Sequence, residues 1–395
     1  WMSQDIQMGL PREGMDMLSS EEDLRDGTYR RLRNVDISKE GIVRRRPGFK
    51  RVVNNPGMHS LYAYGDKLLF VDRGSLMLFN PETRVGDVLG LVGDFPLHYT
   101  EYNGYIYMSS IQGCWRLDNG VLHPVGVTNW YSGGLPFTVD HDNQTEWTHK
   151  VTVAVSVVSP YGEESGAKVV GECDLSDLPE SGDWGDLRIY STAGAAGAWV
   201  LVGSVEPCEV LGLEALPGGH FITGHNGRLC VAVDNCVVFS EALRPHLYDP
   251  ATNVIPFVGK LKMLVSNGDC LYVADDRGVW ILKGKDLIEA SLEQVTSAII
   301  VTGSALVVPS TALPAGREDM NISEGEDLVV FLTEHGYVGG RGNGSLVSLS
   351  RGLVKLPAGR EGHTVLLERD GMAQLVSAIN ATSLEAIGVA RDATF

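Results

Sequence analysis

The sequence predicts an all-β protein of the β-propeller class, and three observations carry this prediction. Few windows place apolar residues at the i, i+3, i+4 and i+7 spacing of an amphipathic helix. Short β-branched or aromatic runs instead end repeatedly at Gly, Asn or Asp, which favour turns. These runs also recur in similar pairs along the 395 residues.

The paired runs form six similar hairpins. Each has a turn rich in Asn, Gly or Asp, an inner apolar run, a tight polar turn and a second strand that ends in an aromatic or branched residue. The clearest copies cover residues 64–83, 102–120, 225–243 and 266–284, and weaker copies cover 324–342 and 361–378. Because a propeller blade is a small antiparallel sheet, six hairpins predict a six-bladed propeller. A β-sandwich built of hairpins is the alternative.

An inserted module is predicted between the second and third hairpins, which lie more than one hundred residues apart whereas most others are closer to forty. Within the interval, residues 149–170 alternate apolar and polar side chains around a glycine turn that carries Glu163 and Glu164. A further strand with the sequence R-I-Y-x-T begins at Arg188. This order resembles a fibronectin type III β-sandwich, and its length fits one. A simple extra hairpin is the alternative.

The chain is therefore expected to have four segments. An extended N-terminal arm with a first strand occupies 1–53, and the first part of the propeller occupies 54–135. The fibronectin type III-like sandwich occupies 136–216, and the second part of the propeller occupies 217–395.

Charge divides the arm from the rest of the chain. Residues 1–53 hold eleven Lys or Arg and nine Asp or Glu, a balance of +2, whereas the remainder holds 21 basic and 41 acidic residues, a balance of −20. Three consecutive arginines in the arm, at 44–46, are costly to bury. They either protect a solvated edge strand from aggregation or form a docking arm that pairs with an acidic neighbour. The interface candidates are Arg44, Arg45, Arg46, Arg30, Arg31 and Arg33.

The bulk composition excludes several classes of protein. A hydrophobic content of 44% and a mean hydropathy of zero, with no apolar run near the roughly 20 residues that cross a bilayer, predict no membrane span. A net charge of −18 argues against gripping nucleic acid by neutralising phosphates. Six cysteines without the spacing of a zinc site predict buried thiols made in a reducing cytoplasm. The N-terminal residues do not have the pattern of a secretory leader, so we expect no secretion route.

Motifs of common catalytic and nucleotide sites are absent from the sequence. HExxH, GxSxG and GxxxxGK[ST] do not occur, and the ten histidines are scattered; we expect His220 and His225 to satisfy turns. The acidic stretch 140–144 lacks the glycine and the bidentate Glu of a calcium loop, so a loop leading into the insert is favoured over a calcium site. We therefore expect no catalytic residue, no cofactor and no metal.

Two pairs of adjacent carboxylates are candidates for glycoside hydrolysis, which needs two carboxyl groups facing each other across a cleft. They are Glu163 with Glu164 and Asp275 with Asp276. Adjacent residues of a strand point to opposite faces, and in a turn both face water. An enzyme is thus the less favoured interpretation. The glycine-rich stretch 339–344 does not open a helix, as a phosphate cradle would, and a wide turn is predicted.

Two phrases resemble the tail nozzle or tail hub proteins of short-tailed bacteriophages. One is NVDISKEGIVRRRPG at 34–48, and the other is GRLCVAVDNCVVFSEAL at 227–243, which in that family marks a pair of propeller strands. The resemblance covers the arm and most of the propeller. It implies a hexameric ring of identical subunits beneath the portal and adaptor, with tail fibre or tail needle proteins as neighbours.

The same resemblance implies a location in the virion tail, after assembly in the host cytoplasm. Such a ring would extend the channel through which DNA passes without sequence-specific binding, and would close it until ejection at the host envelope. Larger nozzles carry long extra domains for which this chain has no room, so nozzle, smaller hub and stopper remain open.

Physical arguments from charge agree with this picture. An acidic wall repels phosphate, and a basic arm complements an acidic body on the next subunit of a ring. The competing hypothesis is a propeller that binds or cleaves glycans of the host surface. Its tryptophans would stack on sugars, although those at 115 and 280 lie in hairpin strands and are expected in the core. The candidates are Trp115, Trp130, Trp147, Trp184 and Trp280. A bacterial scaffold protein unrelated to virions is a third alternative.

Overall fold

The computed structural model describes the chain as strands joined by turns. The described residues are 57–139, 149–180, 184–204, 206–312, 325–350, 361–369 and 372–379, with short stretches at 14–15, 19–20, 23–24, 28–29, 35–37 and 43–45. Within these ranges the only helical elements are three 3-10 turns, Leu175–Asp177, Ala195–Gly197 and Ser310–Ala312. None of the described helices is long and apolar enough to cross a membrane. The prediction of an all-β chain is confirmed.

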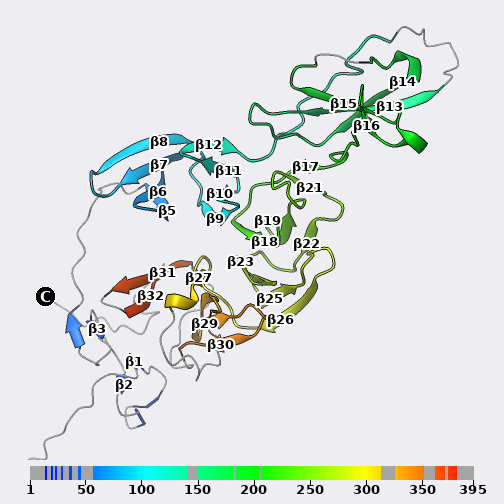
Figure 1. Ribbon diagram of the computed structural model, residues 1–395. Coiled ribbons are helices and arrows are strands. Elements are labelled where there is room, and N and C mark those ends of the chain that lie inside the picture. Colours follow the sequence, from blue (N-terminus) through cyan, green and yellow to red (C-terminus); the bar gives the residue numbers. More distant parts are fainter. Residues whose placement is uncertain are drawn as a thin grey trace, which may run out of the picture. The chain divides into compact units, whose positions relative to one another are not determined.

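Two compact units divide the chain (Figure 1): residues 57–256 form one, and residues 1–56 with 257–395 form the other. Besides the sheet of the insert, which is described below, the first unit contains three four-stranded antiparallel sheets in which every strand but one pairs with its sequence neighbours. Their strands are β5 (Met58–Tyr64), β6 (Lys67–Asp72), β7 (Ser75–Asn80) and β8 (Val85–Leu91); β9 (His98–Tyr102), β10 (Tyr105–Ser110), β11 (Gly113–Asp118) and β12 (Val121–Pro124); and β18 (Phe221–His225), β19 (Arg228–Val233), β20 (Cys236–Phe239) and β22 (Val254–Pro256).

The second unit contains two more four-stranded antiparallel sheets and a two-stranded one. Their strands are β23 (Met263–Asn267), β24 (Cys270–Asp275), β25 (Gly278–Lys283) and β26 (Ser291–Thr296); β27 (Leu306–Val308), β28 (Leu328–Thr333), β29 (Gly336–Gly340) and β30 (Leu346–Ser348); and β31 (Gly362–Arg369) with β32 (Met372–Ile379). The arm contributes two short pairs: β1 (Gly14–Met15) with β2 (Thr28–Tyr29), and β3 (Val35–Ile37) with β4 (Val43–Arg45).

All six predicted hairpins are present. Five are the two middle strands of the four-stranded sheets, and the sixth is the β31–β32 pair. A four-stranded antiparallel meander is the blade of a β-propeller. The chain is therefore an all-β propeller protein, and its described residues include five four-stranded blades followed by the two-stranded β31–β32 sheet.

The first three blades pack face to face, as propeller blades do. One apolar cluster joins the first two blades through Leu69 and Met108, and another joins the second and third through Tyr107 and Ile222. The strands between two sheets are buried on both faces, which explains the nearly continuous apolar runs of the hairpins.

The fourth and fifth blades pack in the same way. Tyr272 and Phe331 share one apolar cluster. The Tyr272 hydroxyl also donates a hydrogen bond of 2.6 Å to the carbonyl of Arg341. A Cβ atom on Gly340 would lie 2.6 Å from the Tyr272 ring, so glycine permits this close approach. The glycine-rich stretch 339–344 forms the predicted turn, between β29 and β30, and serves packing.

The insert contains one four-stranded sheet in the order β14-β13-β15-β16. Its strands are β13 (Lys150–Val157), β14 (Lys168–Asp174), β15 (Leu187–Ser191) and β16 (Val200–Leu201). The predicted order of strand, glycine turn, strand and R-I-Y strand is present. Along β13, Val151, Val153 and Val155 pack in a cluster with Leu135 on one face, and Ala154 packs with Val210 on the other.

The sheet order of the insert is that of the larger sheet of immunoglobulin-like sandwiches, in which the third strand returns to pair with the first. A second sheet facing it is not among the strands that the structure describes. The fibronectin type III-like sandwich, with its bounds at 136–216, stays a prediction.

Candidate functional site

The arm presents two of the predicted interface arginines on a strand. Arg44 and Arg45 lie in β4, opposite Asp36 and Val35 of β3, and both arginines are exposed. Their neighbouring positions on a strand direct the two guanidinium groups to opposite faces. The remaining candidates, Arg30, Arg31, Arg33 and Arg46, lie outside the described residues. Exposure fits both a solvated edge and a docking arm, so the docking role stays a prediction.

The second phrase of the resemblance begins β19 and ends just after β20. Arg228 opens β19, and its Nη1 donates a hydrogen bond of 2.9 Å to the carbonyl of Ser240. The same Nη1 lies 3.7 Å from Oε2 of Glu241, and the guanidinium carbon lies 5.5 Å from the ring centroid of Phe239. Arg228 therefore ties the start of the hairpin to its end.

Ser240 of this phrase is fully buried. Its Oγ accepts a hydrogen bond of 2.9 Å from the amide of Leu229 and donates one of 3.1 Å to the carbonyl of Glu241. The hydroxyl replaces a backbone partner at the point where β20 leaves the sheet. A serine here satisfies polar groups that burial would otherwise leave unpaired.

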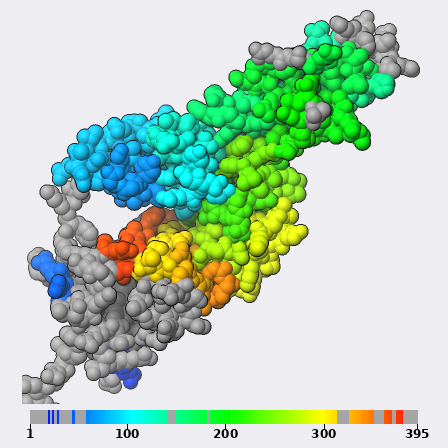
Figure 2. All heavy atoms as spheres, in the orientation of Figure 1, coloured from blue at the N-terminus to red at the C-terminus, as the bar shows by residue number. Residues whose placement is uncertain are grey.

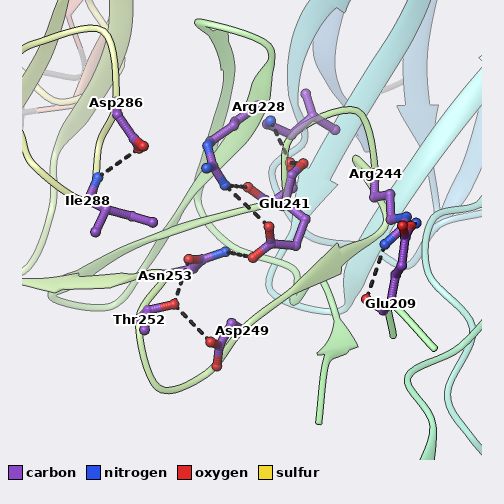
Figure 3. A network of polar contacts seen from close by, with 11 residues as sticks. Glu209, Arg228, Glu241, Arg244, Asp249, Thr252, Asn253, Asp286 and Ile288 are labelled. Carbon is purple, nitrogen blue, oxygen red and sulfur yellow. Dashed lines mark hydrogen bonds and ion pairs between the residues drawn. The ribbon is translucent and has the colours of Figure 1, made fainter. Parts of the chain in front are cut away.

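Glu241 anchors the loop that follows. Its Oε1 accepts a hydrogen bond of 2.6 Å from Nδ2 of Asn253, a fully buried residue just before β22. Farther along the loop, Oδ2 of Asp249 accepts a hydrogen bond of 2.9 Å from the Thr252 hydroxyl. Figure 3 shows Arg228, Glu241 and Asn253 pointing toward one another, with Thr252 and Asp249 continuing the network. The loop 240–253 is thus held at both ends.

A further ion pair holds the middle of the loop. Nη1 of Arg244 donates a hydrogen bond of 3.1 Å to the carbonyl of Glu209, and Nη2 pairs with the Glu209 carboxylate (Figure 3). Beside it, β17 (Glu214–Ala215) pairs with β21 (Leu247–Tyr248). These contacts join the third blade to the segment that leaves the insert. The phrase GRL…FSE therefore has a structural role in this chain.

Leu243 lies within this braced loop in a strained conformation. Its φ is 61°, which costs a non-glycine residue roughly 1–2 kcal/mol, and its side chain is 84% exposed. We expect Leu243→Gly to raise the free energy of unfolding by about 1 kcal/mol, because glycine adopts this φ without strain and little apolar packing is lost. Urea denaturation measures the change. Leu292→Gly is the control, since Leu292 is half-exposed on β26 with ordinary strand geometry; a stabilisation of both variants would contradict the explanation.

The carboxylates Glu163 and Glu164 are both engaged in structural contacts. Glu163 lies 3.3 Å from Nη1 of Arg116 on β11. Glu164 accepts hydrogen bonds from the Tyr190 hydroxyl at 2.7 Å and from Arg188 at 3.2 Å, and also from Ser156. One carboxylate joins the insert to the second blade, and the other organises the insert's own sheet.

Asp275 and Asp276 are likewise separated in role. Asp275 is 1% exposed and accepts hydrogen bonds from the amides of Gly259 at 3.3 Å and Arg277 at 2.8 Å, and from the Trp280 indole at 3.1 Å. Asp276 pairs with Lys262 at 2.6 Å. Neither candidate pair places its two carboxylates around a common substrate position.

The two histidines that were expected to satisfy turns both lie beside turns. His225 is buried beside the turn that follows β18, where its ring lies 3.2 Å from Nδ2 of Asn226, and His220 lies 4.0 Å from Asp234 at the β19–β20 turn. The stretch 140–144 falls outside the described residues. Among the residues that are described, no group of three His, Cys, Asp or Glu side chains is placed to hold a metal ion.

The candidate sugar-stacking tryptophans are dispersed. Trp115 and Trp280 are half-buried in apolar surroundings of the second and fourth blades, and Trp184 packs in the insert with its ring 6.5 Å from that of Phe137. Trp130 is 63% exposed. Trp147 lies outside the described residues. The expectation that Trp115 belongs to the core is confirmed in part, because its side chain contacts a buried cluster.

The cysteine prediction holds for four of the six residues. All six are free, and those at 114, 173, 230 and 270 are buried, whereas those at 208 and 236 are half-buried.

Sequence reasoning missed the junction between the insert and the blades. The Arg116 and Glu163 pair is joined there by His246, whose pKa is lowered by burial against the opposing effect of nearby Glu163. These residues come from three separate parts of the chain. No spacing rule relates them, so no signal in the sequence could have identified the junction.

Comparison with known proteins leaves the family open. No family model matches the chain, and no curated protein matches it. Among solved structures, BBS1N in complex with ARL6DN is 12% identical, with 84% of this chain and 94% of that chain covered and a TM-score of 0.30. Apo AztD from Citrobacter koseri is 11% identical, with coverage of 83% and 76% and a TM-score of 0.30.

The N-terminal domain of Nup159 is similar to the same extent, at 11% identity, coverage of 81% and 72%, and a TM-score of 0.33. Likenesses at these TM-scores carry no argument about fold or function. The assignment to the propeller class rests on the sheet topology and on the packing of consecutive blades.

Proposed function

We propose that this chain is a structural, non-enzymatic subunit of a bacteriophage tail, which assembles into a homo-oligomeric ring below the portal and adaptor. The observation that carries the proposal is the contrast between an arm with a balance of +2, whose Arg44 and Arg45 are exposed on a strand, and a remainder with a balance of −20. An arm and a body of opposite charge complement each other between neighbouring copies. The two phrases at 34–48 and 227–243 direct the proposal to nozzle or hub proteins.

In such a ring each contact joins two different surfaces, and a rotation that closes on itself gives a defined number of subunits, for which we propose six. Guanidinium groups suit this contact because they bind carboxylates through two parallel hydrogen bonds. The acidic remainder would face the DNA that passes through. Its repulsion of phosphate acts within a Debye length of about 8 Å at physiological salt.

The contacts of the carboxylates favour this proposal over the glycan-cleaving alternative. Asp275 and Glu164 each accept several hydrogen bonds from the protein itself, which leaves them poorly placed for a substrate. A structural subunit needs no such chemistry. Its proposed neighbours are the portal and adaptor above and tail fibre or needle proteins beside it, within the virion.

Electron microscopy of the purified full chain mixed with a portal–adaptor assembly tests the proposal. The expected result is a closed ring with a central hole, alone or on the assembly. A protein that stays monomeric and does not associate with the assembly would overturn it. Release or binding of sugars on a glycan array, together with a monomeric state, would instead support the alternative function.

Replacing Arg44, Arg45 and Arg46 with Ser is expected to weaken ring assembly at least tenfold while the melting temperature changes little. The described arginines are exposed, so they contribute to association more than to the folded core. Sedimentation velocity and thermal unfolding measure the two effects.

A control variant removes the same charge elsewhere: Arg84→Asn, Arg277→Ser and Lys285→Ser, all at exposed positions. Asn is chosen at position 84 because φ there is 59°. If the arm variant assembles as the unmodified chain does, or if the control is equally impaired, the arm has no specific docking role.

A further inference from the structure

The last sheet of the chain has two strands where each blade before it has four. β31 and β32 are both eight residues long and pair without a bulge from Gly362 opposite Ile379 to Arg369 opposite Met372. In Figure 2 this sheet reaches the surface in red. Among the described strands, none pairs with the outer edge of β32. Among the described residues, this sheet therefore has two of the four strands of a blade.

The two strands are nevertheless anchored as a blade would be. Leu366 and Leu375 pack on the cluster of the fifth blade. The hydroxyl of Ser377 lies 2.6 Å from that of Tyr337 on β29. On the other face, Val365 is 58% exposed and Leu367 45% exposed. The sheet thus has a fixed position on the fifth blade and an incomplete outer side.

The open edge of β32 has none of the usual protection against pairing. Natural edge strands carry charges, prolines or bulges that block the addition of another strand. The outer strands of the first and fourth blades follow this rule: β8 carries Asp87, β26 carries Glu293, and each is bulged against its neighbour. The sequence of β32, MAQLVSAI, contains no charge and no proline. Such an edge is a template for a strand.

The arm also contains a sheet of only two described strands. β3 and β4 form another two-stranded sheet, and an isolated sheet of two strands is marginally stable in water. Added to β31 and β32 it would make four strands, the number in every other blade. A single chain contains both sheets and leaves them in two separate sheets. The partner of each is therefore sought on a second copy.

We propose that the β3–β4 hairpin of one copy adds to the open edge of β32 on the next copy and completes its last blade. This rests on the proposed function and specifies the contact that joins the ring. Main-chain hydrogen bonds along β32 provide the affinity, as in other cases of strand addition. The arginines at 44 and 45 accelerate the encounter with an acidic neighbour. The contact is head-to-tail, as a closed ring requires.

Disulfide trapping in the full chain tests the proposal. Val43→Cys on β4 is combined with Gln374→Cys or Val376→Cys on β32, and the protein is oxidised under mild conditions. The expected result is a ladder of covalent dimers and larger species that disappears on reduction. The control combines Val43→Cys with Val88→Cys, on the exposed outer strand of the first blade, and single variants report on the native cysteines. A cross-linked monomer would show that the hairpin pairs within its own chain and would overturn the proposal, as would the absence of any cross-link.

A second variant tests the edge without new thiols. Ala378→Lys places a charge at an exposed position of β32 and is expected to weaken self-association at least tenfold with an unchanged melting temperature. Val88→Lys is the control and is expected to have no effect. If rings form on the portal–adaptor assembly but neither the cross-link nor the Ala378→Lys effect is seen, strand addition is wrong while the proposed function stands. If no ring forms at all and the cross-link is absent, both are wrong.

Discussion

Replacing Asp275 with Ala is expected to lower the free energy of unfolding by about 3 kcal/mol. Its carboxylate is almost fully buried and accepts hydrogen bonds from two backbone amides and from the Trp280 indole. Alanine would leave these donors without a partner, and each unpaired buried donor costs about 1–3 kcal/mol. Urea denaturation of the full chain measures the loss.

The neighbouring residue provides the matched control. Asp276 forms an ion pair with Lys262, but its side chain is 58% exposed, so Asp276→Ala is expected to cost about 0.5 kcal/mol or less. Asp275→Asn keeps one acceptor oxygen and should cost less than Asp275→Ala. Equal losses for Asp275→Ala and Asp276→Ala would show that the buried hydrogen bonds do not stabilise the turn.

The stability of the chain is expected to fall steeply in alkali, by about 5 kcal/mol between pH 9 and pH 11. Burial raises the pKa of Cys114 and of Cys230 to about 12, because a thiolate is poorly solvated in the core. The folded chain therefore keeps these protons at a pH where the unfolded chain, with an ordinary thiol pKa near 8.5, has lost them. Stability is complete below that ordinary value and is lost as the pH rises through the folded values.

Buried tyrosines act in the same direction at higher pH. Burial raises the pKa of Tyr99 and of Tyr272, so the folded chain also holds their protons above pH 10. Urea denaturation at unit steps from pH 8 to pH 11, in the presence of a reductant, measures the dependence. Cys230→Ala should reduce the loss without removing it, because burial also raises the pKa of Cys114 to about 12 and that of Cys173 to about 11. A stability that stays constant from pH 8 to pH 11 would contradict the argument.

The hairpins could be predicted because their signals are local. In each, a turn rich in Gly, Asn or Asp precedes a buried strand, and a connection of two residues joins that strand to its own partner. The outer strands β8 and β26 are mostly exposed, and glycines or polar residues interrupt their apolar residues, so no continuous apolar run marks them. Their pairing follows from the free edge that the hairpin offers.

The contacts of the candidate residues could not be predicted in the same way. Glu163 and Glu164 are adjacent in sequence, yet one joins Arg116 on β11 and the other joins Tyr190 on β15. Likewise, Glu241 reaches Asn253 because a loop folds back on the third blade. Such pairings depend on how segments that are distant in the sequence pack together. The spacing of residues along the chain does not predict this packing.

The sequence by itself determined that this chain is made of repeated antiparallel hairpins with an insertion and a basic arm. Alternation of apolar residues, turn residues and charge are properties of neighbouring positions, and they act before any long-range contact forms. Only the tertiary structure decided that the adjacent carboxylates accept hydrogen bonds from the protein itself and that a loop holds Leu243 in a strained, exposed state. It also decided that no described strand pairs with the second edge of β32. Each of these depends on which distant strands meet, because burial and unsatisfied pairing are properties of the packed chain.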